Sequence, residues 1–448
     1  MPLATFLRTA TSTGVLGLTR YQWLVIAAAW CGWGFDVFDA LLFNLVAPNC
    51  IPTLLGLTPG SPEARGPTLF WTGMLSATLL VGWAIGGLLF GRIADRVGRQ
   101  KILILTVLVY SVGTGLCAFA GDIWQLLACR ALASLGIGGE WAVGAALVAE
   151  AVPDERRVEA GAVLQTASPL GLALAGFVNY QVAAVWFAGD PTTSWRYVFL
   201  FGLIPAGLAL FVRLFLHETH RFEAARATSP PPLTALLSSD VRASTFSGLF
   251  MAVAAVLAWW SCTAFMPVLV TMLAQDHGAV AGLDAAGVRE LAEQWKVEAS
   301  NWFNLGGLLG TFLAIPIARR FGRRQVFATY FLISLVAMTA TFGANLSPEA
   351  RINGYFAIGL GVYGVFAAFV FYLPELFPTR LRAAGAGLTY NFGRIFAACG
   401  IFLVGVVSQR AGGSEGLLDV LTWVAIIPAI ALIGSRWIVE TRGRPLPP

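Results

Sequence analysis

The feature that most constrains this chain is a series of long apolar segments. Each has about 20 residues or more and few charges, long enough to cross roughly 30 Å of hydrocarbon as a helix. Twelve such segments lie at 21–47, 69–90, 101–121, 124–149, 160–187, 195–216, 244–273, 299–318, 325–345, 352–377, 383–407 and 417–438. Charged residues make up 12% of the 448 residues, about half the roughly 25% typical of soluble proteins. The sequence therefore predicts an all-α integral membrane protein with twelve transmembrane helices.

The basic residues predict the orientation of these helices. Of the 29 Lys and Arg residues, 21 fall in the termini and in the loops that share their side, and six fall in the opposite loops. The remaining two, Arg130 and Arg394, lie inside the spans. By the positive-inside rule, this asymmetry places both termini in the cytoplasm. We expect a multi-pass protein of the cell membrane or of a bacterial inner membrane.

Two motifs recur at nearly constant offsets and indicate an internal repeat. Glu150-x-x-Pro153-x-x-x-Arg157 returns as Glu375-x-x-Pro378-x-x-x-Arg382, 225 residues later. Asp95-Arg96-Val97-Gly98-Arg99 returns in altered form as Arg319-Arg320-Phe321-Gly322-Arg323. Such a repeat predicts two pseudo-symmetric six-helix halves with a substrate cavity between them near the middle of the membrane.

The predicted spans divide the chain into two halves and a connector. We expect the halves at 1–216 and 244–448, and a cytoplasmic linker at 217–243 that contains Pro230-Pro231-Pro232. The segment 274–298 is expected to be the longest outside loop, with a short amphipathic helix from Val288 to Trp295.

Ionisable residues inside the spans are costly, and such residues usually face a cavity or a partner. Asp36 and Asp39 are three residues apart, so they share one helical face. Mutual repulsion and poor solvation favour proton uptake by such a pair, which we interpret as the proton-coupling site. The alternative is that Arg130 holds one of the two ionised. Glu140 is a second candidate proton site, or else a gate partner for an arginine elsewhere.

Arg394 lies deep in the eleventh span, with Tyr390 and Asn391 on the same helical face. A guanidinium can bind a carboxylate through two parallel hydrogen bonds. We therefore expect Arg394 to bind an organic acid, with Tyr390 and Asn391 orienting the rest of it. The alternative is an arginine paired with a helix-end carbonyl or with a carboxylate of the other half. The other candidate substrate-binding residues are Arg130, Gln165 and Asn304, the last two of which would otherwise bond between helices.

Several motifs resemble the major facilitator superfamily. The segment from Gly91 to Lys101 resembles the signature loop between spans 2 and 3 of that family. Arg130 with Gly136 and Gly138 resembles its span-4 motif, and Glu375 to Arg380 and Glu440 to Arg444 are similar to segments of its sugar and metabolite porters. Asp36 to Asp39 and Gly138 to Trp141 resemble the metabolite:proton symporters that carry sialate, lactate or aromatic acids.

This resemblance implies roles for cytoplasmic residues. They would hold the two halves together while the site is open to the outside. The residues concerned are Gly91, Asp95, Arg96, Gly98, Arg99, Glu150 and Arg157, with Glu375 and Arg382 as counterparts in the second half. Arg319 stands where the first copy has Asp95, which weakens the same expectation for the second half.

No spacing typical of metal ligands, nucleotide loops or Ser-His-Asp triads occurs, so we expect neither an enzyme nor a cofactor or metal. The absence of a long basic run argues against nucleic acid binding. The expected function is proton-coupled symport of a small organic anion by alternating access. The alternatives are a sugar symporter, a drug/proton antiporter, and a receptor or scaffold with a transporter fold. The sequence does not predict an oligomeric state.

Overall fold

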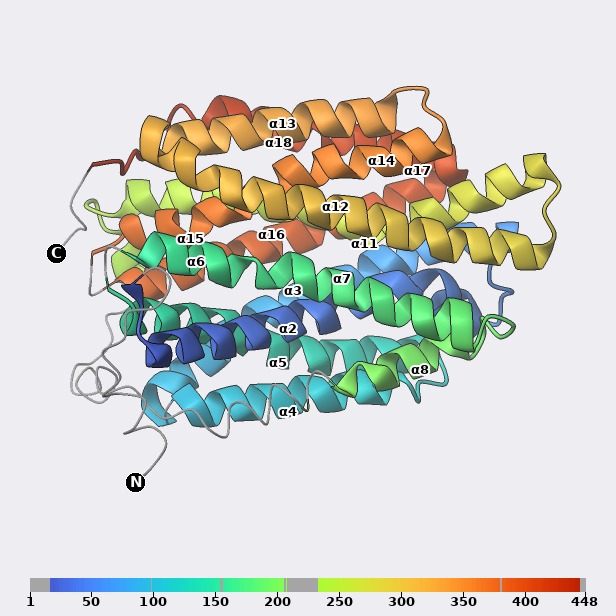
Figure 1. Cartoon of the computed structure of the whole chain (residues 1–448), viewed down its shortest axis with the longest axis horizontal. Coiled ribbons are helices and arrows are strands. Elements are labelled where there is room, and N and C mark those ends of the chain that lie inside the picture. Colours follow the sequence, from blue (N-terminus) through green and yellow to red (C-terminus); the bar gives the residue numbers. More distant parts are fainter. Residues whose placement is uncertain are drawn as a thin grey trace.

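The structure is a computed structural model that describes residues 17–97, 99–153, 156–204, 207, 233–378 and 381–443. Within these ranges, every regular element is a helix. Figure 1 shows a bundle of long, roughly parallel helices. Nine helices or helix series in the described part are long and apolar enough to span a membrane, and two shorter apolar helices accompany them.

The first half begins with three long helices and a shorter one. These are α2 (Arg20–Leu54), α3 (Pro62–Val97), α4 (Arg99–Cys117) and α5 (Ile123–Ala151). The fifth span consists of α6 (Arg157–Gln165), α7 (Ala167–Asn179) and a π-helix, η3 (Tyr180–Trp186). The sixth begins with α8 (Ser194–Phe201), and most of its predicted extent lies outside the described residues.

The second half repeats this plan after the short 3-10 helix η4 (Leu233–Leu237). It contains α11 (Arg242–Ala281), α12 (Ala285–Phe321) and α13 (Arg323–Gly343). The tenth span is α14 (Pro348–Ile358), the π-helix η5 (Gly359–Tyr363) and α15 (Phe366–Glu375). The chain continues with α16 (Arg382–Ala411), α17 (Gly413–Val424) and α18 (Ile426–Gly434). The predicted twelve-helix fold in two halves is confirmed.

The two halves meet along helices that correspond in the repeat. α3 packs against α16, and α7 packs against α12. α3 and α12 are the second spans of their halves, and α7 and α16 are the fifth spans. Each contact therefore joins the second span of one half to the fifth span of the other, as a pseudo-twofold relation between the halves requires. α2 and α11, the first span of each half, also touch each other. At Gly73 of α3, an added Cβ would lie 3.0 Å from the Cα of Gly405 in α16, so glycine permits this close approach.

The prediction of a long loop at 274–298 is wrong. α11 extends to Ala281 and α12 begins at Ala285, with Asp284 accepting a hydrogen bond from the Gly287 N–H as the N-cap. The amphipathic stretch from Val288 to Trp295 is part of α12. Its helical conformation was therefore predicted correctly, but hydropathy did not join it to the following span because Glu293 and Lys296 are charged. These two residues pair with each other inside the helix bundle.

Candidate functional site

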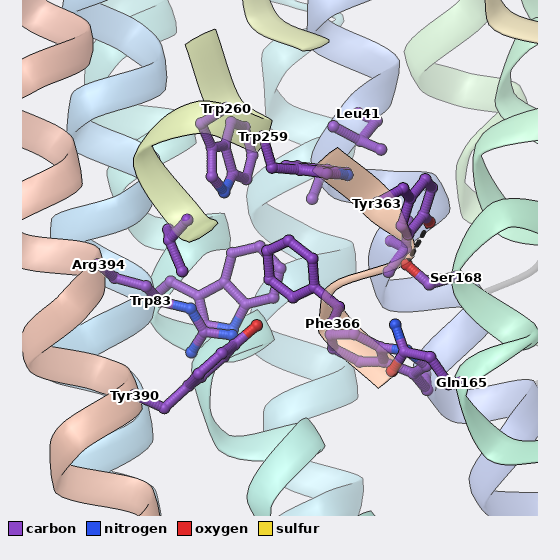
Figure 2. Close-up of a pocket in the computed structure, with 14 residues that line it drawn as sticks. Leu41, Trp83, Gln165, Ser168, Trp259, Trp260, Tyr363, Phe366, Tyr390 and Arg394 are labelled. Atoms are coloured by element: carbon purple, nitrogen blue, oxygen red, sulfur yellow. Dashed lines mark hydrogen bonds between the residues drawn. The ribbon is translucent and has the colours of Figure 1, made fainter. Parts of the chain in front are cut away.

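A cavity lies between the two halves, and Figure 2 shows how its side chains converge. It is lined from α2, α3, α6, α7, α11, η5, α15 and α16 by Trp33, Val37, Ala40, Leu41, Trp83, Gln165, Ser168, Val256, Trp259, Trp260, Tyr363, Phe366, Tyr390 and Arg394. The volume of this cavity is about 40 Å³, which is room for only a few water molecules.

Arg394 provides the positive charge of the cavity wall. Its side chain is 3% exposed, and its Nη1 donates a hydrogen bond to Oδ1 of Asn391 at 2.7 Å. The guanidinium carbon lies 4.2 Å from the ring centroid of Trp83 and 4.6 Å from that of Tyr390. Stacking on two rings fixes the plane of the guanidinium and partly offsets its burial. The three residues predicted as a polar stripe of α16 therefore lie together, joined by Trp83 from the other half.

Polar groups also lie on the opposite side of the cavity. The Tyr363 hydroxyl donates to Oγ of Ser168 at 2.5 Å, a hydrogen bond that joins η5 of the second half to α7 of the first (Figure 2). The amide of Gln165 lies on the same side. The π-helical turn of η5 ends at Tyr363 and belongs to a type of irregularity that is frequent at functional sites.

Aromatic rings fill most of the wall between these two polar ends. Trp259 and Trp260 lie 5.0 Å apart between ring centroids. Trp260 packs edge-on against Trp83 at 6.2 Å, and Trp259 packs in the same way against Tyr363 at 5.6 Å. Flat, weakly polar walls of this kind suit a ring-shaped ligand.

The two aspartates predicted as one proton site have different partners. Asp39 accepts a hydrogen bond from Thr114 of α4 at 2.8 Å, and Arg130 acts on it electrostatically. Asp36 is fully buried, and its charge acts on Arg394 across the interface between the halves. The two carboxylates thus lie in the electrostatic fields of two different buried arginines.

Arg130 and Asn304 are buried but do not line the cavity. Arg130 donates to the Ala40 carbonyl at 3.0 Å and lies over the ring of Phe43, so its described contacts are within the first half. Asn304 lies on α12. Glu140 lies on α5, but its side chain is outside the described residues, and nothing further follows for it.

The predicted cytoplasmic residues are described only in part. Gly98 and the side chains of Asp95, Arg96, Arg99, Glu150 and Arg157 lie outside the described residues, and Gly91 lies in α3. Glu375 accepts two hydrogen bonds from Arg323, at 2.9 and 2.5 Å. Arg382 donates to the Pro374 carbonyl. Glu375 and Arg382 therefore make these contacts inside the second half.

An ion pair between the end of α12 and the start of α6 joins the halves. Arg319, in the altered copy of the signature loop, pairs with Glu159 of α6. Arg319, which stands where the first copy of the motif has Asp95, therefore connects the second half to the first.

Sequence reasoning missed Trp33, Trp83 and Phe366 as cavity residues. A signal was present for the tryptophans, because membrane tryptophans concentrate at the two interfaces, whereas Trp33 and Trp83 fall inside predicted spans. Phe366 is indistinguishable from a core residue by sequence.

Comparisons with known proteins agree with this geometry. Residues 58–229 match the family described as "Sugar (and other) transporter". The "Probable 4-methylmuconolactone transporter" of Cupriavidus pinatubonensis is 32% identical over 93% of this chain and 90% of its own length. The "Gallate transporter" of Pseudomonas putida is 26% identical, over 93% and 92%.

A solved structure supports the same fold. The crystal structure of a D-xylose–proton symporter superposes with a TM-score of 0.72 at 18% identity, covering 95% of this chain and all of that one. Together with the full-length relatives, this match identifies an integral membrane transporter and not an enzyme. The chain belongs to the major facilitator superfamily.

Proposed function

We propose that this protein carries a small, ring-bearing organic acid across the membrane together with a proton, by alternating access of the central cavity to the two sides. The observation that carries the proposal is Arg394, a buried guanidinium between two aromatic rings in the wall of a cavity that both halves form. A buried charge without a function is costly, and a carboxylate is the ligand that a guanidinium fork fits best.

The aromatic wall favours a ring over a short aliphatic acid. Trp83, Trp260, Trp259 and Phe366 offer flat surfaces for stacking, whereas lactate would leave them largely uncovered. The names of the relatives point the same way, since gallate is an aromatic acid and 4-methylmuconolactone is a ring acid. The polar groups of Gln165 and Ser168 would bind oxygen substituents at the end of the ring away from the carboxylate.

Proton coupling is supported by the charges around the cavity. The charge of Asp36 acts on Arg394, so an arriving carboxylate would add a second negative charge to the surroundings of that guanidinium. Protonation of Asp36 would remove the first of these charges, and an anion and a proton would then enter without leaving a bare charge buried. In the conformation described here the cavity is too small for a ring acid, which supports a cycle in which the halves move apart.

The test is uptake by proteoliposomes with and without an inward proton gradient. The panel should contain benzoate, gallate, lactate, sialate and D-xylose. We expect gradient-driven accumulation of a ring acid that a protonophore abolishes. Accumulation of lactate alone would contradict the choice of a ring acid, and accumulation without dependence on the gradient would contradict symport.

A sugar symporter is the second candidate. The match to the family described as "Sugar (and other) transporter" and the likeness to the D-xylose–proton symporter favour it. Uptake of D-xylose alone would select this function and would reduce Arg394 to a structural residue.

A further inference from the structure

The first half of α12 contains a buried ion pair that the proposed transport site does not use. Nζ of Lys296 donates to Oε1 of Glu293 at 2.5 Å, one helical turn apart. Lys296 is 1% exposed and Glu293 is 7% exposed. Burying two charges is expensive unless their remaining hydrogen-bonding groups are also satisfied.

The other half of the protein satisfies those groups. Nδ2 of Asn179, at the end of α7, donates to Oε2 of Glu293 at 3.0 Å. Nδ2 of Asn49, on α2, donates to Oε1 at 3.4 Å. Lys296 also donates to the Leu45 carbonyl of α2 at 3.3 Å. Three of the four hydrogen bonds in this far-end cluster (Glu293, Lys296, Asn49, Asn179 and the Leu45 carbonyl) therefore join the two halves.

Both charges of the cluster lie on the same half, so the two halves can separate here without leaving an unpaired charge. Both ions belong to one helix and neutralise each other there, while the first half contributes only two amides and a carbonyl. When the halves separate, Glu293 and Lys296 move together with α12. Neither half then keeps an unpaired charge, and water can replace the three hydrogen bonds.

The cluster lies toward one end of the bundle. It is near the connection between α11 and α12, which extends at the end opposite to the start of α2 and the end of α18 (Figure 1). Closer to the same end, Arg65 of α3 pairs with Asp276 of α11 at 2.8 Å, a second connection between the halves. That pair is partly exposed, and exposed ion pairs contribute little. The far-end cluster, by contrast, keeps the hydrogen bonds that Asn179 and Lys296 make between the halves away from water.

We propose that the far-end cluster closes this end of the central cavity, and that its three bonds between the halves break whenever the cavity opens there. The topology prediction makes this the outside. The proposal rests on the alternating access of the proposed function, but not on the choice of substrate.

The test is the distance between the two halves at this end, measured by pulsed electron paramagnetic resonance on the full chain. Spin labels at the exposed positions Glu63 of α3 and Arg289 of α12, attached through a keto-bearing unnatural amino acid, leave the native cysteines in place. The variant Asn49→Ala/Asn179→Ala removes two bonds between the halves and keeps the ion pair. These bonds exist only in the closed state. We therefore expect the ratio of the population with the long, open distance to the population with the short, closed distance to rise at least tenfold.

A nearly isosteric variant provides an independent readout. Asn179→Asp replaces a donor by a carboxylate that faces Glu293, so repulsion should open this end at least as far as the double variant does. The matched control is Gln294→Ala, which removes a hydrogen bond to Glu290 within α12 and leaves the contacts between the halves intact. It should keep the distances of the parent protein.

The outcomes separate this proposal from the proposed function, because the distances require no substrate. Unchanged distances in both Asn179 variants would overturn the role of the cluster, whatever the uptake panel shows. An equal shift in Gln294→Ala would also overturn it, because the effect would then not depend on bonds between the halves. A shift confined to the Asn179 variants would support it even if none of the tested compounds were transported.

Discussion

At the scale of single residues, the stacked guanidinium of Arg394 gives the sharpest prediction. Arg394→Lys keeps the charge but removes the fork and the fixed plane between Trp83 and Tyr390. A hydrogen bond to a charged group contributes about 1.5–3 kcal/mol, so KM for a transported acid should rise roughly 10- to 100-fold. Initial uptake rates against concentration measure this. Arg242→Lys, at an exposed position at the start of α11, is the control and should keep its KM. An unchanged KM in Arg394→Lys would exclude carboxylate binding there.

The different partners of the two aspartates lead to a second prediction. Asp36 acts on Arg394, whereas Asp39 is bound by Thr114 within the first half. Asp36→Asn should therefore abolish accumulation driven by a proton gradient, while exchange of labelled for unlabelled substrate continues. Asp39→Asn should lower the stability of the protein in detergent, because it weakens a buried hydrogen bond and removes the countercharge of Arg130. Gradient-driven accumulation by Asp36→Asn would contradict the assignment.

The sequence predicts a residue of the site when its side chain is polar inside an apolar, membrane-spanning segment. Arg394, Tyr390 and Gln165 line the cavity as expected, because a polar group in an apolar span needs a partner or a cavity. The ring centroid of Trp83 lies 4.2 Å from the guanidinium carbon of Arg394, yet in sequence an apolar ring looks like a packing residue. Arg130 shows the opposite case, since it is polar and intramembrane but bound to the Ala40 carbonyl away from the cavity.

At the scale of elements, the C-terminal motif that begins at Glu440 caps a helix of its own half. Its carboxylate accepts hydrogen bonds from the backbone N–H groups of Arg323 and Arg324, both at 3.0 Å, at the start of α13. Burial raises the pKa of this carboxyl, but these and neighbouring backbone N–H groups outweigh burial and hold the pKa below its ordinary value. The ionised form is thus the one that stabilises α13.

This lowered pKa gives the effect of pH a definite sign. The stabilisation by Glu440 is complete above the pKa of the unfolded chain and is lost as pH falls through the lower pKa of the folded state. Glu440→Gln should therefore be less stable than the parent by about 1 kcal/mol at pH 7, and the difference should shrink below about pH 4.5. Thermal unfolding in detergent at both pH values measures it. Glu298→Gln, an exposed position away from both ends of α12, is the control. A difference that stayed constant with pH would contradict the capping role.

Helix boundaries were predictable where apolar runs end in loops and were wrong where charge is buried. The start of α12, from Ala285 to Trp295, was expected outside the membrane, with only a short separate helix from Val288, because hydropathy counts Glu293 as exposed. Only the pairing with Lys296 and with the amides of the other half makes that position tolerable in the interior. A sequence window contains no information about partners on α2 and α7.

At the scale of the whole molecule, the repeat was the most informative feature of the sequence. The offset of 225 residues predicted two equivalent halves, and the packing of α3 on α16 and of α7 on α12 obeys that equivalence. The equivalence fails in the charges. Arg319 replaces the acidic residue of the first copy and pairs with Glu159, so the two halves contribute different groups to their common interface.

The two ends of the bundle are thus joined by different groups. Which of these groups faces the cytoplasm depends on the orientation of the protein in the membrane. α2 begins and α18 ends at the same end of the bundle, as an even number of spans requires (Figure 1). With 21 basic residues on that side and six on the other, we expect that end to face the cytoplasm. Val280, which is 91% exposed beside the turn between α11 and α12, should then lie outside.

The measurement is labelling of single introduced cysteines in intact cells by a membrane-impermeant maleimide. Val280→Cys should react from outside, whereas Arg320→Cys, at the other end of α12, should react only after the membrane is opened. The parent protein gives the background from its own cysteines. The opposite pattern would reverse the topology. The far-end cluster of Glu293 and Lys296 would then close the cytoplasmic side of the cavity, and the pair of Arg319 with Glu159 would lie outside.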